Sequence, residues 1–467
     1  MSDDPRILPA DELQSAAPHV AVAIVGAGAC GLTAAVRLAG AGVDCVALER
    51  DAVPAGSTAL SSGLVPAAGT RAQAAAGVAD SPEEFAADIE AKAHGRAAPH
   101  LVAAYTRAIG PALDWLEQAH GLHWEVQDGF LYPGHGVRRM HCLRERTGAA
   151  LVTALATAAE RSGAMLMTRA RVRDLYCDAG RRVVGVGIER PDGDREAIRC
   201  DAVLLACNGF GGNAAMVHEW LPEMRGAVFA GHAGNDGSAI AWGRALGAGL
   251  ADLGACQGHG SWAVPHGALL SWAPMTAGAV QVNARGERFH DETQGYSEAA
   301  IQVLAQPGGI AWNVYDDRLL ALAREFPDFR DAEAAGALRL APDVAVLAAL
   351  IGCDEGTLRA TLEALRAGAG PDAFGRQVER PLVPPFHTAR VTGALFHTQG
   401  GLAIDAECRV LRASDGAPLP NLLAAGGAAR GVSGDGISGY LSGNGLLSAV
   451  AGGYIAAATA MDMVARR

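Results

Sequence analysis

The sequence contains few basic side chains and no paired cysteine motif. Its 467 residues include 38 Lys and Arg against 50 Asp and Glu, a formal charge of -12. Because nucleic acids are bound by basic faces, this balance argues against nucleic acid as the main partner. The nine cysteines are scattered, with no CxxC pair and no Cys/His cluster at metal-ligand spacing. We therefore expect reduced thiols, no bound metal, no haem and no iron–sulfur cluster.

Signals for export and for membrane insertion are also missing. The N-terminal sequence MSDDPRILPADELQ is acidic and has no hydrophobic core. This predicts that there is no signal peptide and that the protein is cytoplasmic. Residues 436–461 carry no charge, but they are rich in Gly, Ala and Ser and begin with turn residues. We expect a loop that leads into a buried helix there, and no membrane span.

Hydrophobic residues and glycines are abundant. Half of the residues are hydrophobic, so the chain can form a sizeable core, and its length suggests two to three domains. Glycine accounts for 60 residues without a G-X-Y period. This excess is typical of tight turns and of backbone that closely approaches a ligand.

A glycine motif near the N-terminus predicts a dinucleotide-binding site. Residues 20–25 form an apolar strand, and Gly-Ala-Gly-Ala-Cys-Gly, a helical stretch and a second apolar strand follow. In this pattern Gly26 makes the tight turn, Gly28 lets the backbone approach a pyrophosphate, and Gly31 lets the helix pack on the strand. The helix N-terminus attracts the phosphates, and Glu49 at the end of the second strand accepts hydrogen bonds from a ribose. The motif does not distinguish NAD from FAD.

A small, hydroxyl-rich segment follows, GSTALSSGLVPAAGT at residues 56–70. Its composition suits either a backbone that lines an extended cofactor or a surface loop of low complexity. The segment resembles the flavin-binding segment of the fumarate reductase/succinate dehydrogenase flavoprotein superfamily, particularly of its soluble single-chain branch. Further stretches resemble that superfamily in the same order, so that the likeness extends over about residues 20–460: 101–124, 147–175, 201–213, 234–250, 396–405 and 422–457.

The resemblance implies an α/β fold, in which a Rossmann-like FAD-binding domain of the glutathione-reductase type contains an inserted α+β capping domain. It places the FAD-binding domain at 19–257 and 398–467 and the capping domain at 258–397. The covalent-flavin histidine of the respiratory enzymes corresponds to Ser57, which implies non-covalent FAD. The family's ribityl-binding glutamate corresponds to Gly427, so another residue must make that contact. The expected FAD contacts are Gly26, Ala27, Gly28, Cys30, Gly31, Glu49, Arg50, Ser57, Thr58, Ser61, Ser62, Gly63, Leu64, Val172, Ala206, Cys207, Asn213, Asp236, Gly426, Gly427, Asn444 and Leu446.

The substrate positions agree with the family at the histidines and depart from it at the arginines. Fumarate reductases hold a substrate carboxylate with histidines and arginines, and one arginine donates a proton. His259 in QGHGS and His397 in FHTQGG resemble the family's two histidines. Without these flanking motifs, each would be interpreted as an ordinary structural histidine. The two arginine positions are occupied by Tyr296 and Tyr440, so a site for a dicarboxylate would lose two bidentate contacts.

Tyrosines at these two positions resemble the 3-ketosteroid dehydrogenases of the same superfamily, and Tyr-x-Ser-Gly at 440–443 is similar to their Δ4 type. There one tyrosine takes the proton next to a ketone, and another tyrosine with a backbone N–H holds the carbonyl oxygen. We predict an FAD-dependent dehydrogenase that acts on CH–CH groups and desaturates the bond α,β to a ketone, with hydride transfer to flavin N5. Tyr296 is the expected proton-transfer residue, and Tyr440 with Ser442 holds the carbonyl. The expected substrate contacts are His259, His397, Arg430 and Asn444.

The substrate and two other functions stay open at this stage. The predicted substrate is a cyclic or steroid-like ketone, and a small ketone that carries a carboxylate, such as 4-oxocyclohexanecarboxylate, suits the histidines. One alternative is reduction of the C=C bond of an unsaturated carboxylate, and another is a non-catalytic flavin-binding module whose two tyrosines only pack. The electrons are expected to leave to a diffusible acceptor, which is a quinone, another flavoprotein or O2. The oligomeric state is not determined.

Overall fold

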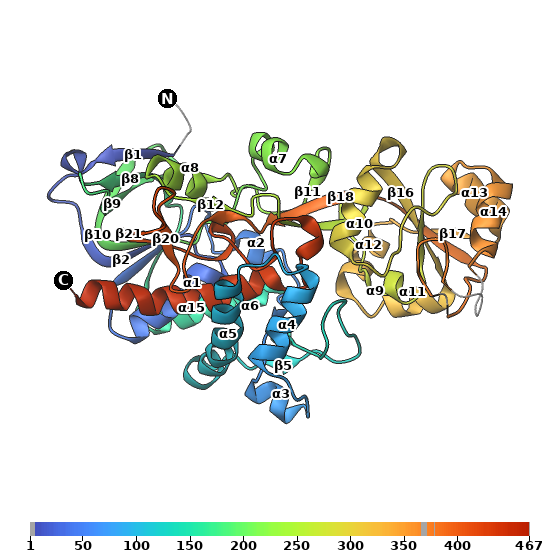
Figure 1. Ribbon diagram of the computed structural model, residues 1–467, viewed down its shortest axis with the longest axis horizontal. Helices are drawn as coiled ribbons and strands as arrows, with labels where there is room; N and C mark the ends of the chain where they lie inside the picture. Colours follow the sequence, from blue (N-terminus) through green and yellow to red (C-terminus); the bar gives the residue numbers. More distant parts are fainter. Residues whose placement is uncertain (1–4, 366–370, 378, 467) are drawn as a thin grey trace. The chain divides into compact units, whose positions relative to one another are not determined.

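The computed structural model describes residues 5–365, 371–377 and 379–466 (Figure 1). By its contacts the chain divides into two compact units. Unit 1 consists of Met1–Trp220, Gly231–Cys256 and His397–Arg467, and unit 2 consists of Leu221–Ala230 and Gln257–Phe396. The chain therefore enters unit 2 twice, first for the short segment Leu221–Ala230 and then for Gln257–Phe396, before it returns to unit 1 for its C-terminal part.

Unit 1 is built on a nine-stranded sheet with the strand order β1-β8-β9-β10-β2-β3-β7, in which β21 pairs with both β10 and β20. The neighbours β21, β10, β2, β3 and β7 run parallel, whereas β8, β9 and β10 pair antiparallel. The predicted apolar strands are β2 and β3, whose aliphatic residues are buried as parallel strands require. The strands are β1 (Arg6–Pro9), β2 (His19–Val25), β3 (Cys45–Leu48), β7 (Met165–Met167), β8 (Arg171–Cys177), β9 (Val183–Glu189), β10 (Arg195–Leu205), β20 (Arg409–Leu411) and β21 (Pro418–Ala424).

The helices of unit 1 bury apolar faces against this sheet and against one another. Helix α1 packs on both α15 and α6, and α5 packs on α15 and α4. The helices are α1 (Ala29–Gly40), α2 (Gly56–Ala59), α3 (Arg71–Ala75), α4 (Pro82–Lys92), α5 (Pro99–His120), α6 (Gly148–Arg161), α7 (Ala214–Trp220), α8 (Ser238–Ala245) and α15 (Asn444–Ala465). Short strands complete the unit: β4 (Val65–Pro66), β5 (Glu125–Val126), β6 (Met140–Cys142), β12 (Leu250–Ala251) and β19 (Gly401–Leu402).

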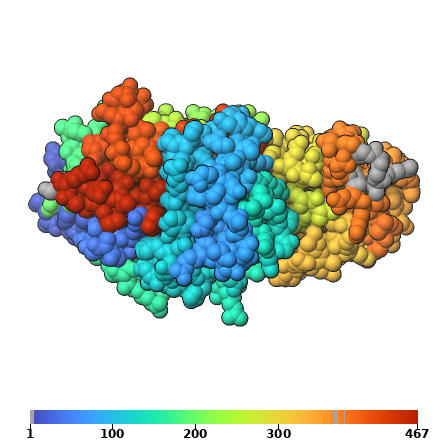
Figure 2. Space-filling model, turned by 60° about the horizontal axis from the view of Figure 1, so that its bottom comes forward, coloured from blue at the N-terminus to red at the C-terminus, as the bar shows by residue number. Residues whose placement is uncertain are grey.

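Helix α15 is the uncharged stretch that the sequence predicts to be a loop followed by a buried helix. By length and composition it is long and apolar enough to cross a membrane, and 56% of its most apolar window is buried. It contacts α1, α5 and the sheet, and Figure 2 shows α15 in red beside the light-blue segment that contains α4 and α5. A buried core helix passes the same test of length and composition, so this test by itself is weak evidence for a membrane span.

Unit 2 contains a seven-stranded sheet with the order β14-β13-β18-β16-β15, and β11 and β17 also pair with β18. Two apolar clusters on this sheet form the core of the unit. Its strands are β11 (Val228–Phe229), β13 (Cys256–Ala263), β14 (Ala268–Leu269), β15 (Val280–Val282), β16 (Ile310–Asp316), β17 (Arg339–Ala341) and β18 (Phe386–Thr398). Its helices are α9 (Ala273–Thr276), α10 (Tyr296–Leu304), α11 (Asp317–Ala323), α12 (Pro327–Ala334), α13 (Val344–Ile351) and α14 (Glu355–Glu363).

Candidate active site

The turn between β2 and α1 requires its glycines. Gly26 has φ +105°, and a Cβ there would lie 2.6 Å from the carbonyl oxygen of Ala206. A Cβ at Gly31 would lie 1.9 Å from the Gly26 oxygen. At Gly28, by contrast, a Cβ would meet only the Thr58 hydroxyl at 3.4 Å. The backbone is thus closely packed behind the turn and accessible at Gly28, as binding of a pyrophosphate requires.

Two predicted cofactor residues bind backbone amides at the start of α1. Glu49 accepts hydrogen bonds from the N–H groups of Ala27 (3.1 Å) and Asp51 (3.0 Å), and burial raises the pKa of its carboxyl group. The Thr58 hydroxyl oxygen accepts from the N–H of Ala29 at 3.1 Å. Cys30 packs close to the backbone of Gly426, because a Cβ at Gly426 would lie 3.3 Å from the Cβ of Cys30.

A second group joins the end of β3 to two later turns. Arg50 donates to the Gly234 carbonyl (3.0 Å) and to Asp236 (3.1 Å), and the Asn213 amide donates to the Asp236 carbonyl (3.0 Å). The structure thus brings Arg50, Asn213 and Asp236 together. Ala206 and Cys207 are the first two residues after β10, at the same end of the sheet as Glu49, which follows β3.

The remaining predicted cofactor residues have simpler surroundings. The Ser61 hydroxyl donates to the Thr58 carbonyl (2.7 Å) and accepts from the Gly63 N–H (3.2 Å), while Ser62 is exposed and Leu64 half-buried. Val172 pairs with Ile188, just before an irregularity in the pairing of β8 and β9.

Sequence reasoning missed two asparagines that surround Ser57. The Ser57 hydroxyl accepts hydrogen bonds from the side-chain amides of Asn208 (3.0 Å) and Asn235 (2.9 Å). Asn208 has φ +65°, and its side-chain oxygen accepts from the Gly209 N–H at 2.8 Å. A Cβ at Gly427 would lie 2.1 Å from that oxygen. The space that a glutamate at 427 would enter therefore contains the Asn208 side chain, and uncharged amides and a hydroxyl suit a polyol such as a ribityl chain.

Glutamate at position 427 should weaken FAD binding in this chain rather than restore a family contact. Gly427→Glu forces its side chain into the Asn208 amide, and overpacking of this kind costs about 1–3 kcal/mol, which corresponds to about a 10- to 100-fold rise in the Kd of FAD. Fluorescence quenching of FAD measures the Kd. Adding Asn208→Gly should recover much of the loss, and two additive effects would contradict the proposed overlap.

His397 and Tyr440 lie together in unit 1, with ring centroids 5.7 Å apart at an edge-on angle of 75°. The His397 ring also covers the first turn of α15, since a Cβ at Gly445 would lie 2.7 Å from it. Burial raises the pKa of Tyr440, and hydrogen bonds with the backbone of Gly445 and Gly443 offset this only in part. The Tyr440 side chain is thus a phenol at neutral pH, with its oxygen at the N-terminus of α15.

A chain of hydrogen bonds sets the orientation of His397. The Asn444 amide donates to the Ser433 hydroxyl (3.0 Å), which is 2.9 Å from the Gln399 oxygen, and the Gln399 amide is 3.0 Å from His397 Nδ1. His397 Nδ1 is also 3.3 Å from the Thr398 carbonyl oxygen, which can only accept. That contact places the proton on Nδ1, whereas donation by the Gln399 amide places it on Nε2. Gln399 and Ser433 have no sequence motif of their own and were not predicted.

Two buried polar atoms near the start of α15 have no partner among the described residues. They are Asn444 Oδ1 and Ser448 Oγ, and both side chains are at least 97% buried. Because buried polar atoms are nearly always hydrogen-bonded, these two suit a polar ligand next to the helix. Together with the open face at Gly28, they agree with a bound FAD.

His259 and Tyr296 lie together in unit 2. The His259 ring stacks on Tyr296 (centroids 5.0 Å apart, 17° between planes) and on Phe396 (5.6 Å, 12°). His259 Nδ1 accepts from the Ser261 N–H at 3.1 Å, which leaves the proton on Nε2. Tyr296 is the first residue of α10, directly after Gly295 with φ +134°.

Little positive charge is presented to a ligand by three of the predicted substrate contacts, which are His259, His397 and Arg430. Burial lowers the pKa of His259 to about 3 and that of His397 to about 4, so both rings are neutral at pH 7. Arg430 forms a bidentate ion pair with Asp252 (2.6 and 3.1 Å). Neutral histidines still donate hydrogen bonds, but they attract a carboxylate far less than cations do.

Acid should destabilise the protein through these histidines. In the unfolded chain histidine titrates near 6.5, so below that pH the unfolded state binds more protons than the folded state. The free energy of unfolding therefore falls as pH falls from about 6.5 toward 4, by about 1.4 kcal/mol per pH unit for each histidine. Urea unfolding at pH 7 and pH 5 measures the loss. His259→Gln should reduce it by about 2 kcal/mol, whereas the same change at the exposed His123 should not.

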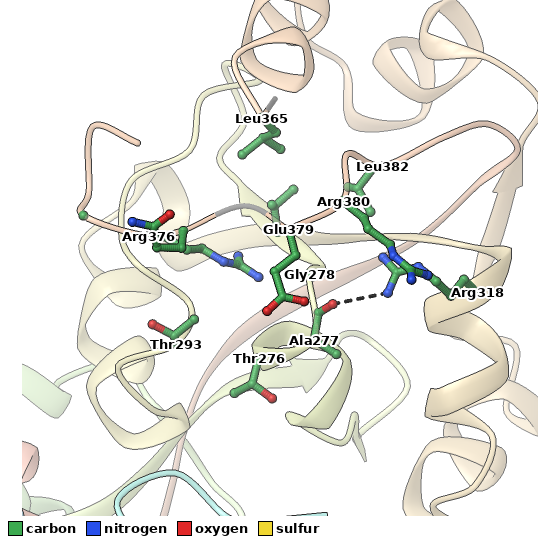
Figure 3. A pocket seen from close by; sticks show the side chains of 13 residues that line it. Thr276, Ala277, Gly278, Thr293, Arg318, Leu365, Arg376, Glu379, Arg380 and Leu382 are labelled. Atoms are coloured by element: carbon green, nitrogen blue, oxygen red, sulfur yellow. Dashed lines mark hydrogen bonds between the residues drawn. The ribbon is translucent and has the colours of Figure 1, made fainter. Parts of the chain in front are cut away.

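Unit 2 also contains a cavity. It has a volume of about 510 Å³, and Arg318, Glu379 and Arg380 point into it (Figure 3). Arg376 in its wall already donates to Glu292 and to the Met275 carbonyl. None of the predicted site residues lines this cavity. Within the described ranges, His, Cys, Asp and Glu form no group of three that could hold a metal ion.

Known proteins resemble the chain over nearly its whole length. The sequence profile of the family described as "FAD binding domain" matches residues 21–446. An NADH:fumarate oxidoreductase of Klebsiella pneumoniae is 28% identical over 88% of this chain and 45% of its own length, so the chain spans about half of that relative. A 4-oxocyclohexanecarboxylate 2-dehydrogenase of Sinomonas cyclohexanicum is 26% identical over 95% of this chain and 96% of its own length.

Two solved structures are similar to the fold. The open conformation of a flavocytochrome c3 fumarate reductase has a TM-score of 0.82 at 26% identity and covers 96% of this chain and 79% of its own. The 3-ketosteroid-Δ4-(5α)-dehydrogenase of Rhodococcus jostii RHA1, in complex with 4-androstene-3,17-dione, has a TM-score of 0.78 at 26% identity and covers 97% and 99%. These similarities confirm the predicted fold class.

Proposed function

Because the chain belongs to the FAD binding domain family and is similar in structure to a fumarate reductase and a ketosteroid dehydrogenase, we propose that it desaturates the carbon–carbon bond next to the ketone of a cyclic substrate. The proposal rests on the resemblance to fumarate reductases, by which Tyr296 and Tyr440 correspond to the two arginine positions of that family. An arginine is always protonated and is a poor base, whereas a phenolate accepts a proton and a phenol donates to a developing enolate.

The two tyrosines take different roles. FAD, when bound to unit 1, supplies the acceptor for the hydride that leaves the β-carbon. Tyr296 accepts the proton that leaves the α-carbon. Tyr440 donates a hydrogen bond to the ketone oxygen, with Ser442 or nearby backbone N–H groups as further donors, and its raised pKa keeps it a phenol for this task. Two hydrogens thus leave the substrate, one as a proton and one as hydride, and a diffusible acceptor takes the electrons.

The charges of the candidate site support a ketone over a dicarboxylate. His259 and His397 are neutral, and the Arg430 guanidinium is paired with Asp252. One relative is named for the oxidation of a cyclic ketone that carries a single carboxylate, and one similar structure contains a steroid ketone. Neutral residues with N–H and O–H donors suit a ketone, and one carboxylate on the substrate remains compatible with the Nε2–H donor of His259.

Anaerobic titration of the purified flavoprotein with cyclic ketones tests the proposal. Steroidal and small ketones are added, with and without a carboxylate, and the absorbance of oxidised flavin is followed. Bleaching by one class of ketone supports desaturation and indicates the size of the substrate. No bleaching, together with reoxidation of dithionite-reduced protein by an unsaturated carboxylate, would overturn it in favour of a reductase. No response in either direction would indicate a flavin-binding module.

The attachment of FAD is tested on the same preparation. By the resemblance, the covalent-flavin histidine of the respiratory enzymes falls near Ser57, whose hydroxyl accepts hydrogen bonds from the amides of Asn208 and Asn235. We therefore expect acid precipitation to release all of the flavin into the supernatant. Yellow colour retained in the protein pellet would contradict non-covalent binding.

A further inference from the structure

A buried ion-pair cluster lies next to the loop that carries Tyr440 and Ser442, and the sequence motifs do not include it. The Arg139 side chain is 1% exposed and donates to both oxygens of Asp80 at 2.8 and 3.0 Å. It also pairs with Asp88. Further N–H donors reach these carboxylates, among them the backbone of Gly136 on Asp88 at 2.7 Å. Charges that are buried and hydrogen-bonded in this way are held in one geometry, because any displacement leaves a charge unpaired.

His135 connects this cluster to the loop. Its Nδ1 is 3.3 Å from Arg139 Nη1, and its Nε2 is 3.0 Å from the carbonyl oxygen of Ser442. A guanidinium can only donate, so Nδ1 accepts from Arg139, and Nε2 carries the proton and donates to Ser442. The contact with Arg139 requires the neutral ring, because a protonated Nδ1 cannot accept, and burial lowers the pKa of His135 to about 4. Arg139 therefore determines the tautomer of His135, and this tautomer binds the loop.

A second contact holds the same loop. A Cβ at Gly134 would lie 2.7 Å from Leu441 Cδ1, so the backbone at 134 packs directly on the completely buried Leu441 side chain. Residues 134 and 135 thus contact residues 441 and 442. The loop then turns at Gly443, with φ +87°, into the first residue of α15. Tyr440, whose oxygen faces the backbone of this turn, depends on the position of the same few residues.

We propose that His135, oriented by Arg139, is a positioning residue that holds the Tyr440–Ser442 loop in the geometry needed for the ketone. The inference rests on the proposed function only for the role of Tyr440, because the contact between His135 and Ser442 is a property of the fold. Without the donor, the Ser442 carbonyl loses a buried partner and the loop samples other conformations. Small displacements of a substrate-binding group lower rates by large factors, so we expect kcat/KM for the ketone to fall by about 10- to 100-fold.

Two substitutions at position 135 distinguish the contact of His135 with the loop from a general contribution of His135 to the stability of the fold. His135→Gln can place an N–H near the former Nε2 and reach Ser442, whereas His135→Asn is too short to do so. The matched control is His141→Asn. His141 is also buried, and its Nε2 and Nδ1 lie 2.7 Å from the Thr70 hydroxyl and the Arg139 carbonyl, which are both outside the loop. The control thus removes a buried histidine from the same region.

Two readouts are measured on the FAD-bound variants. Hydrogen exchange of peptides that cover residues 440–446, without substrate, should be about tenfold faster in His135→Asn. His135→Gln should return it toward the wild-type rate, and His141→Asn should leave it unchanged. The kcat/KM for the ketone should follow the same order, with FAD content unaffected.

The outcomes distinguish the two proposals. Wild-type exchange in His135→Asn, or equal acceleration in His141→Asn, would overturn the positioning role whatever the activities are. If the exchange rates follow the expected order but no ketone reduces the flavin of any variant, the positioning role stands and the proposed function fails. If His135→Asn does not fold, the test rests on His135→Gln. The positioning role would then be overturned if His135→Gln does not keep the wild-type exchange rate and the wild-type kcat/KM.

Discussion

Tyr296→Phe should lower kcat for ketone desaturation by about 10²- to 10⁴-fold, the usual contribution of a proton-transfer residue. The substitution removes the phenol oxygen and retains the ring that stacks on His259 with centroids 5.0 Å apart. FAD content and the urea midpoint should therefore change little. Stopped-flow measurement of flavin bleaching under anaerobic conditions gives the rate of the reductive step directly. Ketone affinity, measured from the concentration dependence of bleaching, should change far less than the rate.

A matched control for this prediction is Tyr315→Phe, also in unit 2. Tyr315 is completely buried, and its oxygen accepts from the Asn313 amide at 2.6 Å. Loss of that bond should cost about 1 kcal/mol of stability but leave bleaching as fast as in the wild type. If Tyr296→Phe bleaches within a factor of about two of the wild type, Tyr296 is a packing aromatic, and Tyr440 becomes the candidate for proton transfer.

Gly31→Ala should strongly impair FAD binding. Its new Cβ would lie 1.9 Å from the Gly26 oxygen and 3.1 Å from Ile24 Cγ2, and the Gly26 oxygen is backbone that cannot move without opening the turn. Forcing the helix away from the strand costs about 1–3 kcal/mol and displaces the amides that are predicted to bind the pyrophosphate, so the Kd of FAD should rise by about 10- to 100-fold. Flavin per chain after gel filtration, and the Kd by fluorescence quenching, measure this effect.

Gly40→Ala provides the comparison within the same helix. Gly40 is the last residue of α1, its φ is not positive, and a Cβ there would meet nothing within 4 Å. Alanine favours a helix over glycine by roughly 0.5–1 kcal/mol, so this variant should bind FAD normally and be equally or slightly more stable. Equal loss of flavin in both variants would indicate that α1 responds to any substitution, and the close-packing argument at Gly31 would then fail.

Several features were predictable because they depend on local backbone requirements. Glycine is required at position 26 because φ is positive there, and at position 31 because helix α1 touches strand β2 there. Both requirements can be recognised from the spacing of the glycines in the sequence. The superfamily, the FAD cofactor and the α/β fold followed from several motifs in order, and the comparisons confirm all three. The roles of Tyr296 and Tyr440 stay predictions, as do the individual FAD contacts.

Other features depend on residues that are distant in the sequence. Nothing near Gly427 indicates that Asn208 fills the space beside it, and nothing near Ser442 indicates that His135 donates to its carbonyl. The ion pair between Arg430 and Asp252, which leaves little charge for a substrate, was likewise missed. Asparagine, histidine and arginine are common in loops, so their presence carries no information until the chain is packed.

The order of residues was sufficient for the cofactor and the superfamily, because these depend on residue identity and local backbone geometry. The folded chain was needed to show that His259 and His397 are neutral and that the Tyr440–Ser442 loop is bound by a buried histidine. The physical reason is that desolvation and side-chain pairing arise only when segments far apart in the sequence exclude water from one another.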